Sequence, residues 1–118
     1  MNNTNKITLY VDLMSQPSRS VYWFILLNDI PHTLELIQLM KGEHRSRAYL
    51  QKYDFPTLCN SRNPLGTVPL IQDGDFYLGE SATIVRYLSN TRRVEDQWYP
   101  SLPRDRAKVD FYLDWCVC

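Results

Sequence analysis

ITLYVDLMSQPS, residues 7–18, is the stretch of this 118-residue chain that predicts the fold. Apolar and polar side chains alternate over residues 7–13, which is the period of a β-strand. Ser15 then stands where a helix N-cap is expected, and Pro17 suits the first turn of a helix. The helix continues with apolar residues at helical spacing, namely Val21, Ile25 and Leu26, with Trp23 and Leu27 as a second apolar flank. A strand that leads directly into a helix predicts an α/β domain.

The segments that follow extend this unit. Residues 28–31, NDIP, end the helix, and residues 32–39 predict a second strand, which should run parallel to the first. Residues 41–53 indicate a weaker helix, and residues 54–66 an irregular loop. Residues 68–72 and 76–78 flank Asp73-Gly74, which is a strong hairpin signal. Ser81 is expected to cap a helix whose apolar stripe is Ile84, Tyr87 and Leu88.

The order βαβ-α-ββ-α is the thioredoxin-like arrangement, an α/β fold with a four-stranded mixed sheet and helices on both faces. Residues 1–92 would form this domain and residues 93–102 a linker. Pro103 would then open a further helix, over residues 103–118, as the start of an all-helical second domain. Three apolar side chains lie four residues apart on one face of that helix: Ala107, Phe111 and Trp115.

Composition excludes several classes of function. The formal net charge is zero, so nothing favours nucleic acid or an anionic membrane as a partner. The densest basic pair, Arg92-Arg93, is interpreted as a solvated helix end. No apolar run is long enough to span a membrane, and the polar N-terminus lacks a signal core, so we expect a cytoplasmic protein. Three cysteines and two histidines argue against a disulfide framework and a structural zinc site, and no metal is expected.

The chemistry depends on what stands at the start of the first helix. A thioredoxin-type oxidoreductase has two cysteines there, and this chain has Ser15 and Ser18 instead, which excludes disulfide chemistry. A hydroxyl and free N–H groups at a helix N-terminus favour an anion. A cysteine thiol is only about 3% ionised at pH 7, so this field would increase its thiolate fraction. The alternative is that Ser15 is only a helix cap.

Further residues predict a binding site for a thiol peptide. Pro69 is expected to be cis, and the backbone of Val68 could then pair with an extended peptide. Ser81 could bind a carboxylate and Glu80 an α-amino group, which together suit a γ-glutamyl residue. His44 could meet the other carboxylate of the peptide. The alternatives are a trans-proline, a plain helix cap and an inert surface histidine.

These segments resemble the N-terminal domain of cytosolic glutathione transferases, most closely the theta class. The similar stretches keep their order along nearly the whole chain: residues 9–17 (LYVDLMSQP), 28–31 (NDIP), 41–44 (KGEH), 63–69 (NPLGTVP), 73–76 (DGDF), 80–81 (ES), 98–100 (WYP) and 109–115 (VDFYLDW). The serine at the first helix, in place of tyrosine or cysteine, points to theta.

The resemblance implies that Ser15 stabilises the glutathione thiolate for attack on a small electrophile or an organic peroxide. Glutathione would be a co-substrate, no other cofactor would be needed, and a homodimer is possible. It also implies roles in glutathione binding for His44, Thr67, Val68, Pro69, Glu80 and Ser81. Thr67 stands where a lysine is common in the family.

Two departures from the family leave other functions open. Residues 52–62 are an insertion whose role is open, and the chain ends at Cys118, where the helical second domain of the family would continue. That domain supplies most of the electrophile pocket, so weak or absent turnover is expected and the electrophile cannot be named. The exposed stripe of the last helix suggests, as an alternative, a non-catalytic module for protein association. A truncated gene product is the third possibility.

Overall fold

The computed structural model describes residues 5–38 and 68–116. Within them the elements follow the order β1, α1, β2, β3, β4, α3, a short 3-10 helix and α4. Three expectations fall outside the described residues: the helix over 41–53, the loop over 54–66 and the insertion at 52–62. None of the described helices is long and apolar enough to cross a membrane.

The sheet is the four-stranded mixed sheet that the sequence predicts. Its strands are β1 (Ile7–Val11), β2 (His32–Leu36), β3 (Leu70–Asp73) and β4 (Phe76–Gly79), in the spatial order β2-β1-β3-β4. β1 and β2 are parallel, as expected for strands joined by a crossover helix. β3 is antiparallel to both β1 and β4.

The first strand is shorter than predicted. β1 ends at Val11, because the chain turns at Asp12 instead of continuing to Leu13. The Asp12 carboxylate accepts a hydrogen bond of 2.9 Å from the Met14 N–H, and its carbonyl accepts another of 2.9 Å from the Ser15 N–H. Aspartate stabilises turns in this way through its own side chain. β2 is also shorter and ends at Leu36.

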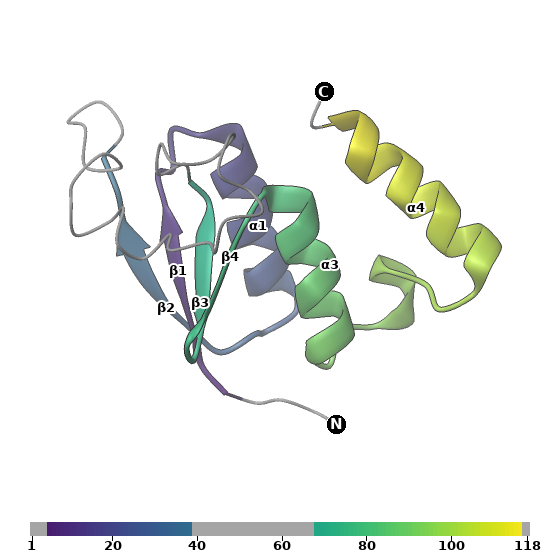
Figure 1. The fold of residues 1–118 in the computed structure, drawn as a ribbon, viewed down its shortest axis with the longest axis horizontal. Coiled ribbons are helices and arrows are strands. Elements are labelled where there is room, and N and C mark those ends of the chain that lie inside the picture. Colours follow the sequence, from purple (N-terminus) through teal and green to yellow (C-terminus); the bar gives the residue numbers. More distant parts are fainter. Residues whose placement is uncertain (1–4, 39–67, 117–118) are drawn as a thin grey trace.

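Helices α1 (Gln16–Leu27) and α3 (Ser81–Thr91) contact each other and cover one face of the sheet (Figure 1). The inward side chains of β1 and β3 pack with both helices in one core: Ile7, Leu9, Val11, Ile71, Val21, Phe24, Ile25, Ile84 and Leu88. The predicted apolar stripe of α1 was wrong in one position. Leu26, which was expected to be part of it, is 46% exposed, and Phe24 is buried instead. Phe24 packs edge-on against Trp98, with ring centroids 5.7 Å apart.

The predicted helix end at residues 28–31 is confirmed. Asn28 is the C-cap of α1, and Asp29 has a positive φ of 51°. The Ile30 N–H bonds to the Ile25 carbonyl at 3.1 Å, and the Asp29 N–H bonds to the Leu26 carbonyl at 3.3 Å. These two bonds form a Schellman motif, which satisfies carbonyls at the helix end that would otherwise lack a donor.

The predicted hairpin is present, but its turn is one residue later than expected. Asp73 pairs with Phe76, so the two loop residues are Gly74 and Asp75. Gly74 has a φ of 65°. A two-residue hairpin with a positive φ at its first loop position favours glycine there, because glycine has no Cβ to oppose that conformation.

Arg92 is buried, so the interpretation of Arg92-Arg93 as a solvated helix end was wrong for its first member. The Arg92 side chain is 2% exposed and pairs with Asp73, whose side chain is 7% exposed, at 3.1 Å. Arg92 also donates to the Asn5 carbonyl at 3.2 Å, while the second oxygen of Asp73 accepts a 2.6 Å hydrogen bond from the Tyr87 hydroxyl. This buried network joins the hairpin, the end of α3 and the segment that enters β1.

The Tyr87 hydroxyl makes the stability of the fold depend on pH. Burial raises the pKa of Tyr87 above its usual value of 10, and the hydrogen bond to the Asp73 carboxylate raises it further. A raised pKa means that the neutral phenol stabilises the fold fully below about pH 10 and that this contribution is lost as the pH rises through the folded-state pKa. We expect the difference in unfolding free energy between wild type and Tyr87→Phe to be constant from pH 7 to pH 9 and to shrink above pH 10. Urea unfolding at each pH measures it, and a constant difference up to pH 11 would contradict the assignment.

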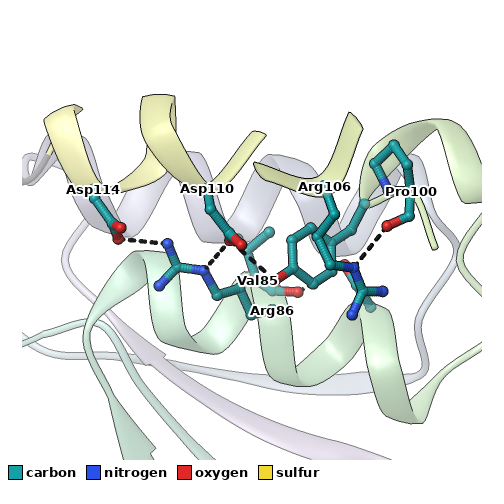
Figure 2. Close-up of polar contacts among 8 residues, drawn as sticks. Val85, Arg86, Pro100, Arg106, Asp110 and Asp114 are labelled. Atoms are coloured by element: carbon teal, nitrogen blue, oxygen red, sulfur yellow. Dashed lines mark hydrogen bonds and ion pairs between the residues drawn. The ribbon is translucent and has the colours of Figure 1, made fainter. Parts of the chain in front are cut away.

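Helix α4 (Pro103–Cys116) follows a 3-10 turn at Asp96–Trp98 and lies beside α3 (Figure 1). Figure 2 shows the contact: Arg86 of α3 pairs with Asp110 at 2.8 Å and also with Asp114, one turn further along α4. The predicted apolar stripe of α4 is exposed, with Phe111 65% and Trp115 67% accessible. The described part of the chain therefore holds α4 mainly through charged contacts.

Candidate functional site

One end of the sheet gathers most of the predicted site residues. Tyr10 of β1 pairs with Leu70 of β3, which in turn pairs with Gly79 of β4. Neighbouring strands lie about 5 Å apart, so the residues next to these three pairs are also close together. Three segments therefore lie at this same end of the sheet: the loop from β1 to Ser15, Pro69 just before β3, and Glu80 just after β4. Figure 1 shows α1 and α3 both beginning there.

Ser15 is the N-cap of α1, as predicted. Its backbone is extended, with φ −86° and ψ 126°, and its hydroxyl oxygen accepts a long hydrogen bond of 3.5 Å from the Ser18 N–H. Pro17 lies in the first turn, where its missing N–H leaves no bond unmade. Ser15 is half-buried. Its hydroxyl hydrogen can therefore be donated to a bound atom while its oxygen caps the helix.

The peptide bond between Val68 and Pro69 is cis, as predicted. Pro69 is buried immediately before β3. Val68 is half-buried and packs with Tyr10 and Leu70 on the face of the sheet opposite α1 and α3. Both residues lie beside the end of β1 that leads into Ser15.

The start of α3 differs from the prediction in one respect. Glu80, not Ser81, is the N-cap, and Ser81 is the first helical residue. The Glu80 side chain is exposed and makes no capping hydrogen bond, and its φ is 68°, in the left-handed region. Such a conformation costs about 1 kcal/mol or more in a non-glycine residue, and such strain clusters at functional sites. Glu80 thus stands at the start of α3 with an exposed side chain that does not cap the helix.

The electrostatics of this end favour an anion. The N-termini of α1 and α3 lie at this end, and each carries a partial positive charge with no acidic residue in its first turn, while the N-cap of α3, Glu80, adds a negative charge. Arg19 adds a full positive charge, because its guanidinium donates to the Leu13 carbonyl at 2.9 Å, in the loop before Ser15. The sequence showed Arg19 only as a helical residue, and the hydrogen bond back to the loop could not be read from it.

Not every predicted segment lies at this end. Asp73-Gly74, the predicted hairpin turn, lies at the opposite end of β3, where Asp73 belongs to the buried Arg92 network. His44 and Thr67 lie outside the described residues. The structure therefore brings five of the predicted site residues to one end of the sheet: Ser15, Val68, Pro69, Glu80 and Ser81.

Comparison with known proteins places this arrangement in a family. A profile described as "Glutathione S-transferase, N-terminal domain" matches residues 14–91. The chain belongs to this family. Human glutathione S-transferase theta-1 is 46% identical over 109 residues, which cover 92% of this chain and 41% of the relative. Human theta-2 is 44% identical over the same coverage. The chain thus spans about two-fifths of the length of these transferases.

Solved transferase structures confirm the thioredoxin-like fold. A crystal structure of human glutathione transferase theta-2 in complex with glutathione has a TM-score of 0.82 and 43% identity, covering 94% of this chain and 42% of that one. A glutathione transferase of Bombyx mori has the same TM-score at 31% identity, covering 99% of this chain and 50% of that one. These comparisons do not favour the alternative of a non-catalytic association module.

Proposed function

We propose that this chain binds glutathione and stabilises its thiolate for attack on an electrophilic carbon or for reduction of an organic peroxide. The observation that carries the proposal is the meeting of two helix N-termini, the Ser15 hydroxyl and the cis-proline segment at one end of the sheet. The family match and the glutathione complex of a theta-class relative support it.

Each site residue has a distinct role in this proposal. Ser15 donates its hydroxyl hydrogen to the sulfur, and the helix N-terminus adds its positive field, so that both act on the charge that performs the attack. The Val68 backbone pairs with the cysteinyl residue beside Pro69. Glu80 and Ser81 hold the α-amino and α-carboxylate groups of the γ-glutamyl residue. His44 and Thr67 are proposed for the glycyl end.

Further proposals concern the wider context of the protein. The second substrate is a small electrophile, and the family supports a homodimer, which sedimentation would detect. A cytoplasmic location suits a reaction that needs a reduced thiol, since thiols are kept reduced there. Cell fractionation would test that location.

Isothermal titration with glutathione and with S-methylglutathione tests whether the site binds the peptide. We expect both to bind, because the γ-glutamyl and cysteinyl backbone contacts do not involve the sulfur. Binding of neither ligand by a chain that unfolds cooperatively on heating would refute the proposal.

Glu80 provides a test in which stability and binding move in opposite directions. Glu80→Gly should raise the unfolding free energy by about 1 kcal/mol, because glycine accepts the positive φ, and should weaken glutathione binding, because the carboxylate is lost. Glu80→Ala should weaken binding equally without that gain in stability. Urea unfolding and calorimetric titration of both variants measure the two effects. Unchanged binding in both variants would remove Glu80 from the site.

A further inference from the structure

The hydroxyl of Ser18 is buried without a hydrogen-bond partner. Ser18 is 0% exposed, and its Oγ atom bonds to none of the described residues. Ser18 precedes Val21 by three residues and Ile25 by seven, so it lies on the core-facing stripe of α1. A buried hydroxyl that is unsatisfied is destabilising and calls for an explanation.

Three other serine and threonine hydroxyls in the described helices are satisfied within their own helix. Ser20, Ser89 and Thr91 each donate to the carbonyl four residues earlier, at 2.8–3.1 Å. Ser18 is too close to the helix start for this arrangement, because the residue four positions earlier, Met14, precedes the N-cap. Its lack of a partner therefore follows from its position in the first turn.

The same position directs the Ser18 side chain toward Ser15. In an α-helix the Cα–Cβ bonds tilt toward the N-terminus, so the side chain of the third residue lies over the N-cap. Third-position side chains commonly reach back to the N-cap N–H, but here the Ser15 N–H is already bonded to the Asp12 carbonyl. Another acceptor near the start of the helix is the Ser15 hydroxyl oxygen, which accepts a long bond of 3.5 Å from the Ser18 N–H but none from the Ser18 hydroxyl.

We propose that Ser18 is a positioning residue for the thiolate, an inference that rests on the proposed function. When glutathione binds, the Ser15 side chain rotates, so that its hydrogen points toward the sulfur and its oxygen comes within reach of the Ser18 hydroxyl, whose hydrogen it then accepts. A hydroxyl that accepts one hydrogen bond becomes a stronger donor in the next, because the bonds in a chain polarise one another. The buried Ser18 hydroxyl thus finds its partner only in the complex, which adds to the preference for the thiolate.

Ser18→Ala tests this role through the pKa of the bound glutathione thiol, measured from thiolate ultraviolet absorbance against pH. We expect this pKa to rise by about 0.5–1 unit, a 3- to 10-fold change in the ionisation constant. The affinity for S-methylglutathione should stay unchanged, because that ligand has no thiol. The melting temperature of the ligand-free variant should not fall, because no hydrogen bond is lost.

Two further variants separate this role from a structural one. Ser18→Cys keeps a weaker donor of similar size and should give an intermediate thiol pKa. Ser20→Ala removes a hydroxyl from the same helix, outside the proposed site, and should leave the thiol pKa unchanged.

A wild-type thiol pKa in both Ser18 variants would overturn the inference and leave the proposed function intact. A loss of S-methylglutathione affinity in Ser18→Ala would also overturn it, because the residue would then be structural. A wild-type chain that binds neither peptide would instead refute the proposed function, and the inference with it.

Discussion

Arg92→Met is expected to lower the unfolding free energy of the chain by about 3–5 kcal/mol, because it leaves the buried Asp73 carboxylate without its counter-charge. In this variant the Asp73 carboxylate stays in the interior, where an uncompensated charge is strongly unfavourable. A loss of this size is a large part of the stability of a small domain. The melting temperature should fall by at least about 10 °C. Urea unfolding followed by circular dichroism measures the free energy.

Asp73→Asn and the double variant show whether the pair acts as a unit. Asparagine keeps an oxygen for the Tyr87 hydroxyl but carries no charge, so the double variant should lose less than the sum of the single losses. We expect a coupling free energy of about 1–3 kcal/mol from this cycle. Arg104→Met is the matched control, since Arg104 is exposed, and should change stability by less than about 0.5 kcal/mol. Equal losses in Arg92→Met and Arg104→Met would contradict the buried pair.

The Arg92 network also shows what the sequence could not predict. Two adjacent arginines after an amphipathic helix are usually solvated, and nothing local to Arg92 indicates its partner. Asp73 is 19 residues earlier and was read as part of the turn, where aspartate is common. The two residues meet because the hairpin and the end of α3 lie at the same end of the sheet. A contact of this kind depends on the tertiary arrangement.

Local patterns, in contrast, predicted the elements and most of the site. Alternation gave β1, turn residues gave the hairpin, and the N-cap at Ser15 was correct, because each depends on interactions within a few residues. The error in the stripe of α1 concerns helical spacing. Phe24 and Ile25 lie three and four residues after Val21 and so share its face, whereas Leu26, five residues after it, does not. At Glu80 the strained backbone overrides the preference for a serine cap.

Ser15→Ala is expected to have the largest effect on the proposed chemistry. Removing a hydrogen-bond donor aimed at a developing anion typically lowers turnover by about 100- to 1000-fold. The hydroxyl is not part of the γ-glutamyl contacts, so glutathione should still bind with an affinity close to that of wild type. The bound thiol should regain a pKa near the value of about 8.5 for a free cysteine thiol. Thiolate absorbance of the complex against pH, beside calorimetric affinity, separates the two effects.

The cap that Ser15 provides requires its own control. Alanine at an N-cap costs about 0.5–2 kcal/mol of stability, whereas glycine costs only a few tenths relative to serine. The observed cap bond is long, at 3.5 Å, so we expect the loss in Ser15→Ala to be at the lower end of that range. Ser15→Gly should therefore lose the thiolate while it keeps nearly all of the stability.

Comparing the two Ser15 variants decides between a catalytic residue and a helix cap. If the hydroxyl stabilises the thiolate, both variants lose thiolate absorbance equally, although only alanine destabilises the fold. If Ser15 only caps α1, thiolate absorbance should follow stability, and Ser15→Gly should resemble wild type. A thiolate retained by both variants would shift the chemistry to the helix N-terminus and Arg19, the remaining positive groups near the start of α1.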